Sequence, residues 1–358
     1  MPNPNLNIDT YGFEFGGGGG GAPVGYTYVV SNSQKLNDWL HGVSGNDYTH
    51  VYIAPGRHVI DYTIASTIKY LDDAYVGTKT ITGAPGSVIC DDTNTHNEAS
   101  THKFTHGLFG YQTLPTKDCF IKGLTIEISK YCGDVSPDYL TGYSYLFFNC
   151  INITECSITA LGTYTKDNEG ATMGDGAPPS IAAQCINISN CYFSIGYTAD
   201  DHHDQGTISA ITSCKDINNC IFNVVNKSTY DRNDDDTDFD YVFMCSNITN
   251  CITSGDNIDS HLGSGPTMFG SCNNMSNIFV HDSGTYDTLD YCNNIDNIMA
   301  KNFIDCKAMS HCCGFSISPS GYISTAAMSY YRCYADHAGT VNIADTAAGG
   351  WNWGTSRW

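Results

Sequence analysis

Aspartate and histidine side chains that could do chemistry gather in four segments of this chain. The four acidic segments are ADDHHDQG (199–206), DRNDDDTDFD (231–240), GDNIDSH (255–261) and HDSGTYDTLD (281–290). Two carboxylates that flank a sugar bond hydrolyse it, and several carboxylates that face one another bind a hard cation such as Ca²⁺. Long surface loops are also polar without any chemistry of their own. Hydrolysis, cation binding and plain solvation are therefore three open interpretations.

The acidic segments supply candidates for each kind of site. The catalytic candidates are Asp200, Asp201, Asp235 and Asp259. The carbohydrate-binding candidates are His202, His203, Asp204, Tyr230 and His261. The metal-ligand candidates, for a Ca²⁺ ion on the acidic flank, are Asp234, Asp235, Asp236 and Asp238. A hydrolase needs one acid with a raised pKa beside an ionised carboxylate, and the sequence singles out no such pair.

A seven-residue phrase, Cys-x-Asn-Ile-x-Asn-Cys, recurs through the region that holds the acidic segments. It reads CINITEC from Cys150, CINISNC from Cys185, CKDINNC from Cys214, CSNITNC from Cys245, CNNMSNI from Cys272, CNNIDNI from Cys292 and, degraded, CKAMSHC from Cys306. The first cysteines are 35, 29, 31, 27, 20 and 14 residues apart. A constant phrase with connections of variable length predicts a solenoid.

The apolar pattern predicts three short strands in each coil. Apolar residues alternate after the second cysteine, as in Cys191, Phe193 and Ile195, and a second apolar run precedes the first cysteine. The central Ile of the phrase belongs to a third strand. The Asn before the second cysteine lies at a sharp bend, because Asn tolerates the left-handed conformation, and its amide can bond to the next coil. These residues are Asn190, Asn219, Asn250, Asn277 and Asn297.

The cysteines of the phrase are predicted to be buried, reduced and free of metal. Ile278 and Ile298 stand where other copies have the second cysteine, so the position is one of packing, and Cys behaves there as a small hydrophobe. The spacing also lacks the CxxC pairs of structural zinc sites. Coils stack in register about 4.8 Å apart, so we expect the acidic segments to lie side by side on one flank.

These residues resemble the right-handed parallel β-helix of the pectin-lyase-like superfamily, with its asparagine ladder, over roughly 28–334. The segment 33–43, followed by TITGAPGSVI (80–89), resembles the capped first coils of that superfamily. Ser33 is the predicted N-cap of a helix that has Leu36, Trp39, Leu40 and Val43 on one face. The predicted fold class is all-β, a right-handed parallel β-helix of three-strand coils with a short N-terminal capping helix.

Four regions are predicted along the chain. They are a candidate anchor peptide (1–15), a glycine-rich linker (16–25), the β-helix (26–340) and a tryptophan-rich tail (341–358). The first residues show neither the basic nor the apolar region of a signal peptide, and no run is long enough to span a membrane. The net charge of −21 argues against a nucleic-acid partner, and it would repel an acidic polysaccharide without bridging cations.

The catalytic motifs of the superfamily are mostly missing. Polygalacturonase-like enzymes carry Asn-Thr-Asp, Asp-Asp, Gly-His-Gly and Arg-Ile-Lys in that order, and only Asp200-Asp201 matches. Pectate lyases use calcium and an Arg or Lys base, whereas Arg232 is the lone arginine of the acidic segments. Neither catalytic site transfers residue by residue.

The combination of these features resembles bacteriophage tail-spike or fibre proteins. The resemblance implies a virion protein that is made in the host cytoplasm, docks on a large assembly through its N-terminal segment, forms a homotrimer and binds cell-surface polysaccharide. The alternative is a polysaccharide-degrading enzyme, a glycoside hydrolase or lyase that uses the acidic flank. A bacterial adhesin is a third interpretation. Ca²⁺ is the one cofactor considered, and neither nucleic-acid binding nor membrane insertion is expected.

Overall fold

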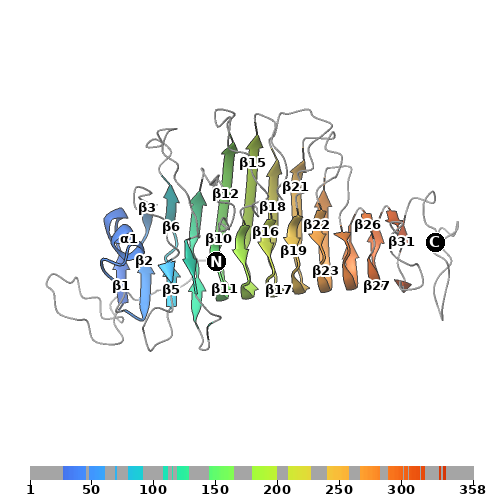
Figure 1. The fold of residues 1–358 in the computed structure, drawn as a ribbon, viewed down its shortest axis with the longest axis horizontal. Coiled ribbons are helices and arrows are strands. Elements are labelled where there is room, and N and C mark those ends of the chain that lie inside the picture. The colour runs from blue at the N-terminus through green and yellow to red at the C-terminus, as the bar shows by residue number, and fades with distance from the viewer. Residues whose placement is uncertain are drawn as a thin grey trace, which may run out of the picture.

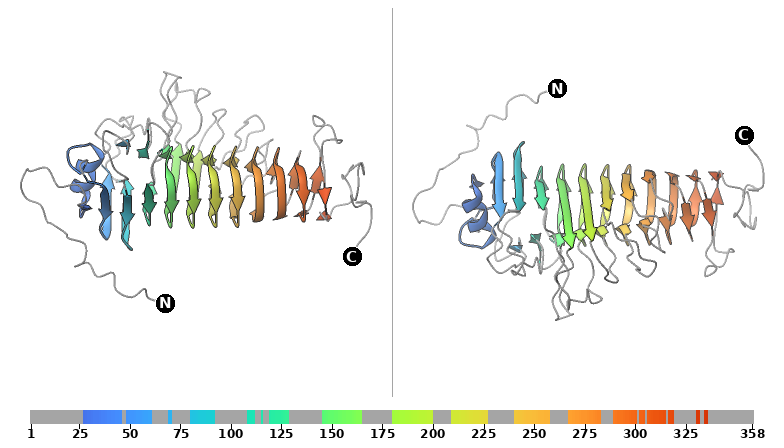
Figure 2. Two further views of the ribbon diagram at one scale, coloured as in Figure 1. Left: turned by 90° about the horizontal axis from the view of Figure 1, so that it is seen from below. Right: turned by 90° about the horizontal axis from the view of Figure 1, so that it is seen from above.

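The protein is an elongated rod built from stacked parallel strands, as a computed structural model shows (Figure 1; Figure 2). Every strand pairing is parallel, and the predicted all-β parallel β-helix with three strands per coil is confirmed. The structure describes residues 27–45, 48–60, 69–70, 80–91, 108–111, 115, 119–128, 145–164, 180–199, 209–226, 240–257, 267–282, 289–300, 302–304, 306–314, 316–318, 330–331 and 334–335. The predicted anchor peptide, linker and tryptophan-rich tail lie outside these residues, so those boundaries stay predictions.

The first face of the rod carries the central strand of each phrase. Its strands, in stacking order, are β1 (Thr27–Val30), β2 (His50–Ile53), β5 (Thr80–Gly83), β8 (Phe120–Lys122), β11 (Ile151–Thr154), β14 (Ile186–Ser189), β17 (Lys215–Asn218), β20 (Ser246–Thr249), β23 (Asn273–Asp282), β25 (Asn293–Met299), β27 (Lys307–Ser310) and β30 (Tyr330–Tyr331). The central residues of neighbouring phrases are register partners, as Ile153 is with Ile188 and Ile188 with Ile217.

The second face carries the strand that follows each phrase. It contains β3 (Gly56–Ile60), β6 (Ser87–Asp91), β9 (Thr125–Ile128), β12 (Ser157–Tyr164), β15 (Tyr192–Ala199), β18 (Ile221–Asn226), β21 (Ile252–Asn257), the ends of β23 and β25, β28 (Cys313–Gly314) and β31 (Tyr334–Ala335). Because β23 and β25 run around the corner without a break, the first and second faces form one continuous sheet.

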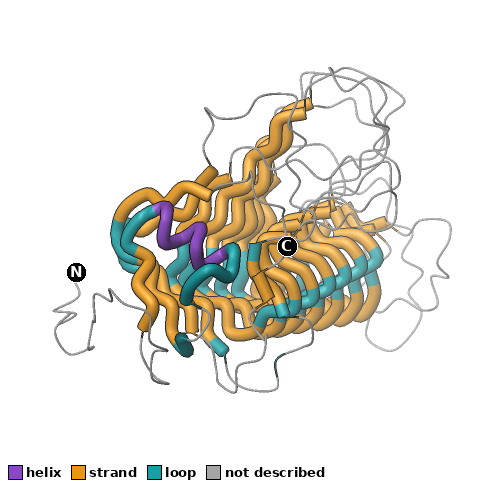
Figure 3. The backbone as a smooth tube through the Cα atoms, turned by 60° about the vertical axis from the view of Figure 1, so that its left-hand side comes forward, coloured by secondary structure: helices purple, strands orange, loops and turns teal. Residues whose placement is uncertain are grey.

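The third face is a separate ten-stranded sheet formed by the strand before each phrase. Its strands are β4 (Lys69–Tyr70), β7 (Phe109–Gly110), β10 (Tyr145–Phe148), β13 (Ser180–Ala183), β16 (Ser209–Thr212), β19 (Asp240–Phe243), β22 (Thr267–Gly270), β24 (Leu289–Asp290), β26 (Asn302–Ile304) and β29 (Ser316–Ser318). Seen towards its end, the rod shows the coils of the three faces stacked behind one another (Figure 3).

Three left-handed residues, spaced three positions apart, bend each coil of the phrase. In the coil of Cys185 they are Gln184, Asn187 and Asn190, with φ of 55°, 59° and 54°. The same three places have positive φ in the other copies of the phrase wherever the structure describes them. The bend at the last of them was predicted from its asparagine, whereas the first two are additional corners. A side chain that directly follows a corner points inward, so the phrase is buried at every third residue, as at Cys150, Ile153 and Cys156.

The cysteines form two columns in the core, one on each side of the central Ile and Met residues. The first column is Cys150, Cys185, Cys214, Cys245, Cys272, Cys292 and Cys306, and the second holds Cys156, Cys191, Cys220, Cys251, Ile278, Ile298 and Cys312. The fourteen cysteines whose side chains the structure describes are buried and free, as predicted for those of the phrase. Each thiol of the phrase turns to a nearby carbonyl; the Cys185 Sγ, for example, donates to the Ala183 carbonyl at 3.2 Å. Burial raises the pKa of the Cys185, Cys245 and Cys272 thiols, which keeps them protonated.

Helix α1 (Ser33–Leu40) lies over the N-terminal end of the rod (Figure 1; Figure 3). Its buried residues are Leu36 and Trp39, and the Trp39 ring lies 5.6 Å from the ring of Phe109 in the third face. A helix at this end covers core and strand edges that would otherwise meet water. The predicted capping helix is therefore confirmed.

Two details of the capping helix differ from the prediction. Asn32, and not Ser33, is the N-cap, because its side chain accepts a hydrogen bond from the Lys35 N–H at 2.9 Å. The Ser33 hydroxyl accepts instead from the Val59 N–H at 2.9 Å and ties the helix to β3. Val43 lies beyond the helix end and is 75% exposed, so it does not extend the apolar face.

We expect the repeat cysteines to react with a thiol reagent only after denaturation, because they are buried in the folded rod. Counting free thiols with and without denaturant, together with elemental analysis for metal, measures this. Several disulfides in freshly purified protein, or stoichiometric zinc, would show that the cysteines do more than pack in the core.

Thr253→Val should raise the free energy of unfolding by about 1 kcal/mol, because it removes a buried hydroxyl without changing the shape of the side chain. Thr253 is fully buried between its register partners Phe222 and Val280, and its hydroxyl has no hydrogen-bond partner among the described residues. The matched control is Thr249→Val, which loses a surface hydrogen bond to Asn218 and should gain nothing. Urea unfolding of the two variants tests this, and an equal or lower midpoint for Thr253→Val contradicts it.

Candidate functional site

The residues predicted from the acidic segments all lie outside the described part of the chain. They are Asp200, Asp201, His202, His203, Asp204, Tyr230, Asp234, Asp235, Asp236, Asp238, Asp259 and His261. The strands that lead into the acidic segments do stack, since Tyr197 pairs with Asn226 and Asn226 with Asn257. The connections therefore leave the rod from one flank, while the catalytic, carbohydrate and Ca²⁺ assignments stay predictions.

A row of exposed apolar side chains runs along the described surface of the second face. The apolar row consists of Tyr192, Ile221, Ile252, Phe279 and Met299, which are 37%, 41%, 44%, 42% and 50% exposed. Each directly follows a residue of the second core column, as Tyr192 follows Cys191, and each is the register partner of the next. Five consecutive coils thus present one apolar side chain each at the same place. Contiguous exposed apolar surface of this kind marks an interaction site.

An asparagine ladder borders the apolar row on one side. We call it the second ladder because it is formed by the second asparagine of the phrase. It consists of Asn190, Asn219, Asn250, Asn277 and Asn297, all at left-handed corners. The Asn219 amide donates to Asn190 at 2.6 Å and the Asn297 amide donates to Asn277 at 2.7 Å. The predicted amide-to-amide bonding is confirmed at these steps and between Asn277 and Asn250, at 3.1 Å. At one step it differs, because Asn250 donates to the neighbouring Asn218 at 2.8 Å.

A short polar column borders the apolar row on the other side. The Ser/Asn column consists of Ser194, Asn223 and Ser254, which lie two residues beyond Tyr192, Ile221 and Ile252 on the same outer surface. The Asn223 amide donates to the Ser194 hydroxyl at 3.1 Å, and the Ser254 hydroxyl donates to the Asn223 carbonyl oxygen at 3.0 Å. Asn223 and Ser254 are half-buried and Ser194 is nearly covered. The apolar row therefore lies between two hydrogen-bonding columns.

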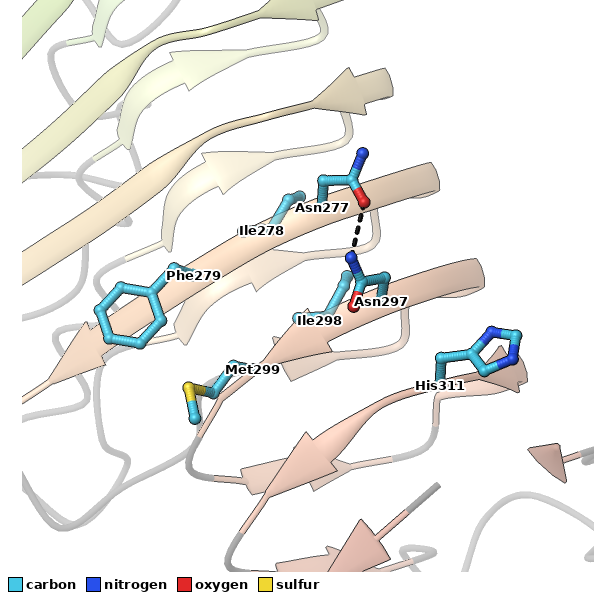
Figure 4. Close-up of a pocket in the computed structure, with 7 residues that line it drawn as sticks. All are labelled: Asn277, Ile278, Phe279, Asn297, Ile298, Met299 and His311. Atoms are coloured by element: carbon cyan, nitrogen blue, oxygen red, sulfur yellow. Dashed lines mark hydrogen bonds between the residues drawn. The ribbon is translucent and has the colours of Figure 1, made fainter. Parts of the chain in front are cut away.

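A groove of about 440 Å³ opens at the C-terminal end of the apolar row. Its lining is Asn277, Ile278, Phe279, Asn297, Ile298, Met299 and His311. Figure 4 shows Phe279 and Met299 side by side on neighbouring strands, with the bonded pair of asparagines next to them. Ile278 and Ile298 are buried and form the floor. The groove thus offers an apolar wall and an amide wall to the same ligand.

The three columns of the site carry no charged side chain, and charges appear where the second ladder ends. Glu155 holds the equivalent corner one coil before Asn190, and its carboxylate pairs with the Lys122 ammonium at 3.1 Å. His311 holds the corner after Asn297, and its Nδ1 lies 2.8 Å from the Asp296 Oδ1. A hydrogen bond from Ser310, together with His311, lowers the pKa of the Asp296 carboxyl. The ladder therefore ends at an ion pair on one side and at a histidine–aspartate hydrogen bond on the other.

A further asparagine ladder, not predicted from the sequence, is formed by the residues at the third place of the phrase. It consists of Asn152, Asn187, Asp216, Asn247, Asn274 and Asn294. The Asn187 amide donates to Asn152, and those of Asn247, Asn274 and Asn294 donate to the coil before at 2.6, 3.0 and 2.7 Å. The repeated Asn at the third place of the phrase was the available signal. The sequence signal for the apolar row was weaker, since the members of the row alternate with buried residues and differ in type.

Neither a metal-binding cluster nor a membrane-spanning helix is present in the described part of the chain. No group of three or more His, Cys, Asp or Glu side chains there has the arrangement of a metal site. No helix among the described residues is long and apolar enough to cross a membrane.

Comparison with known proteins places the chain in no family. No family model matches it, and neither does any curated protein. Among solved structures, the Streptococcus pneumoniae surface protein and adhesin PfbA is 10% identical, with 85% of this chain and 96% of that chain covered and a TM-score of 0.27. A second structure of the PfbA surface adhesin gives 10% identity, coverage of 84% and 89%, and a TM-score of 0.29. Similarity at this level carries no information on function.

Replacing Asn277 separates two roles of the second ladder, the hydrogen bonds between coils and the tolerance of a left-handed corner. Asn277→Ala should lower the free energy of unfolding by about 2 kcal/mol, because alanine makes no ladder bonds and lacks the polar side chain that lets asparagine adopt a φ of 53°. Asn277→Gly should cost about 1 kcal/mol, since glycine adopts that φ without strain. Chemical unfolding measures both. If the two variants are equally stable, the left-handed corner is not what selects asparagine.

Proposed function

We propose that this chain is a receptor-binding β-helix protein of a phage or phage-like particle and that it binds cell-surface glycan along the apolar row. The observation that carries the proposal is the position of the apolar row between two neutral hydrogen-bonding columns. A pyranose ring has the complementary shape. Its faces are C–H groups, and its edges carry hydroxyl groups that both donate and accept hydrogen bonds.

The polar columns have the capacity that sugar hydroxyls need. An asparagine amide has two N–H donors and an oxygen with two lone pairs. In the second ladder Asn277 uses one donor towards Asn250 and one lone pair towards Asn297. One N–H and one lone pair therefore remain for a ligand. Because neither column is charged, the columns do not favour an anionic or a cationic ligand over a neutral one.

The size of the apolar row favours a glycan over a second copy of the chain as its occupant. Large apolar side chains bury about 150–250 Å² each when fully covered, so five that are 37–50% exposed offer roughly 400 Å². A stable protein interface takes about 800 Å² from each partner. The predicted homotrimer would therefore need additional surface outside the row, and it stays a prediction.

The assignment to a virion and to the pectin-lyase-like superfamily rests on resemblance. It is supported by the repeated phrase, the capped first coil and the aromatic N-terminal segment followed by glycines. The predicted attachment through residues 1–15, the synthesis in the host cytoplasm and the Ca²⁺ ion on the acidic flank belong to the same proposal. The alternative function is polysaccharide cleavage by the acidic segments, for which the candidates are the aspartates named above.

Ile252→Asp should reduce binding of host surface polysaccharide at least tenfold, because it places an unpaired carboxylate in the middle of the apolar row. Phe120→Asp is the matched control, since Phe120 is 43% exposed but lies on β8, outside the row. Binding to host cells and to purified polysaccharide is measured for both variants, with circular dichroism as a check on folding.

The same assay follows reducing ends and unsaturated uronates over time. Release of oligosaccharides that is abolished by Asp201→Asn or Asp235→Asn in a folded protein would overturn the binding function in favour of the enzyme. Equal binding by Ile252→Asp and the wild type would show that the apolar row is not the site.

A further inference from the structure

We propose that the bound glycan is a neutral, extended chain that lies parallel to the long axis of the rod, with one sugar ring on each coil and five rings in contact. This inference rests on the proposed function and specifies its ligand. It follows from the register of the apolar row, from the two columns beside it and from the unequal types of its five side chains.

The spacing of the apolar row sets the direction of the chain. Parallel strands repeat about every 4.8 Å, so four steps separate Tyr192 from Met299 by about 19 Å along the axis. Hexopyranoses joined through equatorial bonds form a straight chain that advances by nearly the same distance for each ring. A chain that coils, as α-1,4-linked glucose does, leaves the row after one or two rings.

The columns on both sides repeat with the same spacing as the row. Each ring of an axial chain would therefore meet an apolar side chain below it and an amide of the second ladder at one edge. The Ser/Asn column offers amide and hydroxyl groups at the other edge over the second and third coils, through the half-buried Asn223 and Ser254. Successive rings of a β-1,4 chain are turned over relative to each other, and an all-equatorial ring has C–H groups on both faces. The site thus treats alternate rings alike.

Charge selects a neutral chain. The apolar row, the second ladder and the Ser/Asn column hold no ionisable group other than the Tyr192 phenol, and the next ionisable residue is His281, the register partner of Ser254. The chain as a whole has a net charge of −21. A uronic acid chain would be repelled by the field of the protein and would find no cation in these columns. Neutral hexose or N-acetylhexosamine chains meet neither obstacle.

The two aromatic members of the row determine the shortest chain that binds well. Tyr192 and Phe279 provide the flat surfaces for stacking, and Ile221 and Ile252 lie between them. Tyr192 and Phe279 are three coils apart, or about 14 Å. Three rings contact only one aromatic side chain, whereas four rings reach from one to the other. Met299 adds a fifth contact at the groove, and a sixth ring has no further apolar partner in the row.

The experiment measures the affinity of the full-length chain, by calorimetry, for β-1,4-linked glucose and N-acetylglucosamine oligomers of two to seven rings. In at least one series we expect a step of about tenfold between three and four rings, a smaller gain at five and no gain beyond. The α-1,4-linked glucose oligomers of the same lengths should bind at least tenfold more weakly at four rings and above.

Two variants connect the length dependence to the row. Tyr192→Ala and Phe279→Ala should each remove the step between three and four rings, because each leaves the row with one aromatic side chain. Phe120→Ala, which removes an equally exposed aromatic side chain from β8, should keep the step.

The outcomes separate this inference from the proposed function. Binding of the glycan with no step at four rings, or with equal affinity for the coiled chain, overturns the axial arrangement and leaves glycan binding intact. Binding that survives Tyr192→Ala and Phe279→Ala but is lost on substitution of Asp235 moves the ligand to the acidic flank and also overturns it. Failure of every oligomer and of host polysaccharide to bind removes the proposed function itself.

Discussion

The left-handed residue at every third position of the phrase is the constraint on which this rod depends. Such a residue turns the chain so sharply that the next side chain points inward, and the phrase therefore buries one residue in three. At two of the corners the inward residue is a cysteine whose thiol donates to a nearby carbonyl, as Cys214 does to Thr212 at 3.3 Å. Ile278 and Ile298 show that the position requires an apolar residue and not a thiol, because they are buried in the same column.

The same corners determine the chemistry of the outer surface. Asparagine tolerates positive φ better than most other residues that carry a side chain, so the second and third corners of the phrase become columns of amides. Each amide is held by the coil before it and is already oriented before any ligand arrives. The residue two places beyond the corner starts a flat strand and points outward beside the amide column. Apolar residues at that place form the row from Tyr192 to Met299, so a site with apolar and amide walls arises from one repeating geometry.

Much of this architecture could be read from the sequence, because the residues at the corners and in the core recur in type. The buried cysteines, the second asparagine ladder and the capping helix around Leu36 and Trp39 were all predicted correctly. The first corner of each coil was not found, since Asn149, Gln184, Ser213, Met244, Ser271 and Tyr291 share no side-chain chemistry. Asn32 displaced Ser33 as the N-cap because the Ser33 hydroxyl is engaged by β3, a contact distant in sequence.

The candidate site was harder to predict than the fold, because a sequence read for chemistry favours charged residues. The acidic segments drew attention through their composition, whereas the members of the apolar row look like ordinary core residues until burial is known. Tyr192 and Phe193 are adjacent in the chain, yet one is exposed and the other fully buried. Only the alternation along β15 separates them, and the repetition of that alternation over five coils is what makes a surface.

The variable distance between phrases has a consequence for how such a protein changes over generations. A coil contacts only the coil before it and the coil after it, so duplication or deletion of one whole unit leaves the cross-section of the rod intact. First cysteines stand between 14 and 35 residues apart, which shows that the units already accept connections of very different length. Recombination within the gene could thus lengthen or shorten the rod in steps of about 4.8 Å. The length of the rod would then change by whole coils, and the contacts between neighbouring coils would stay the same.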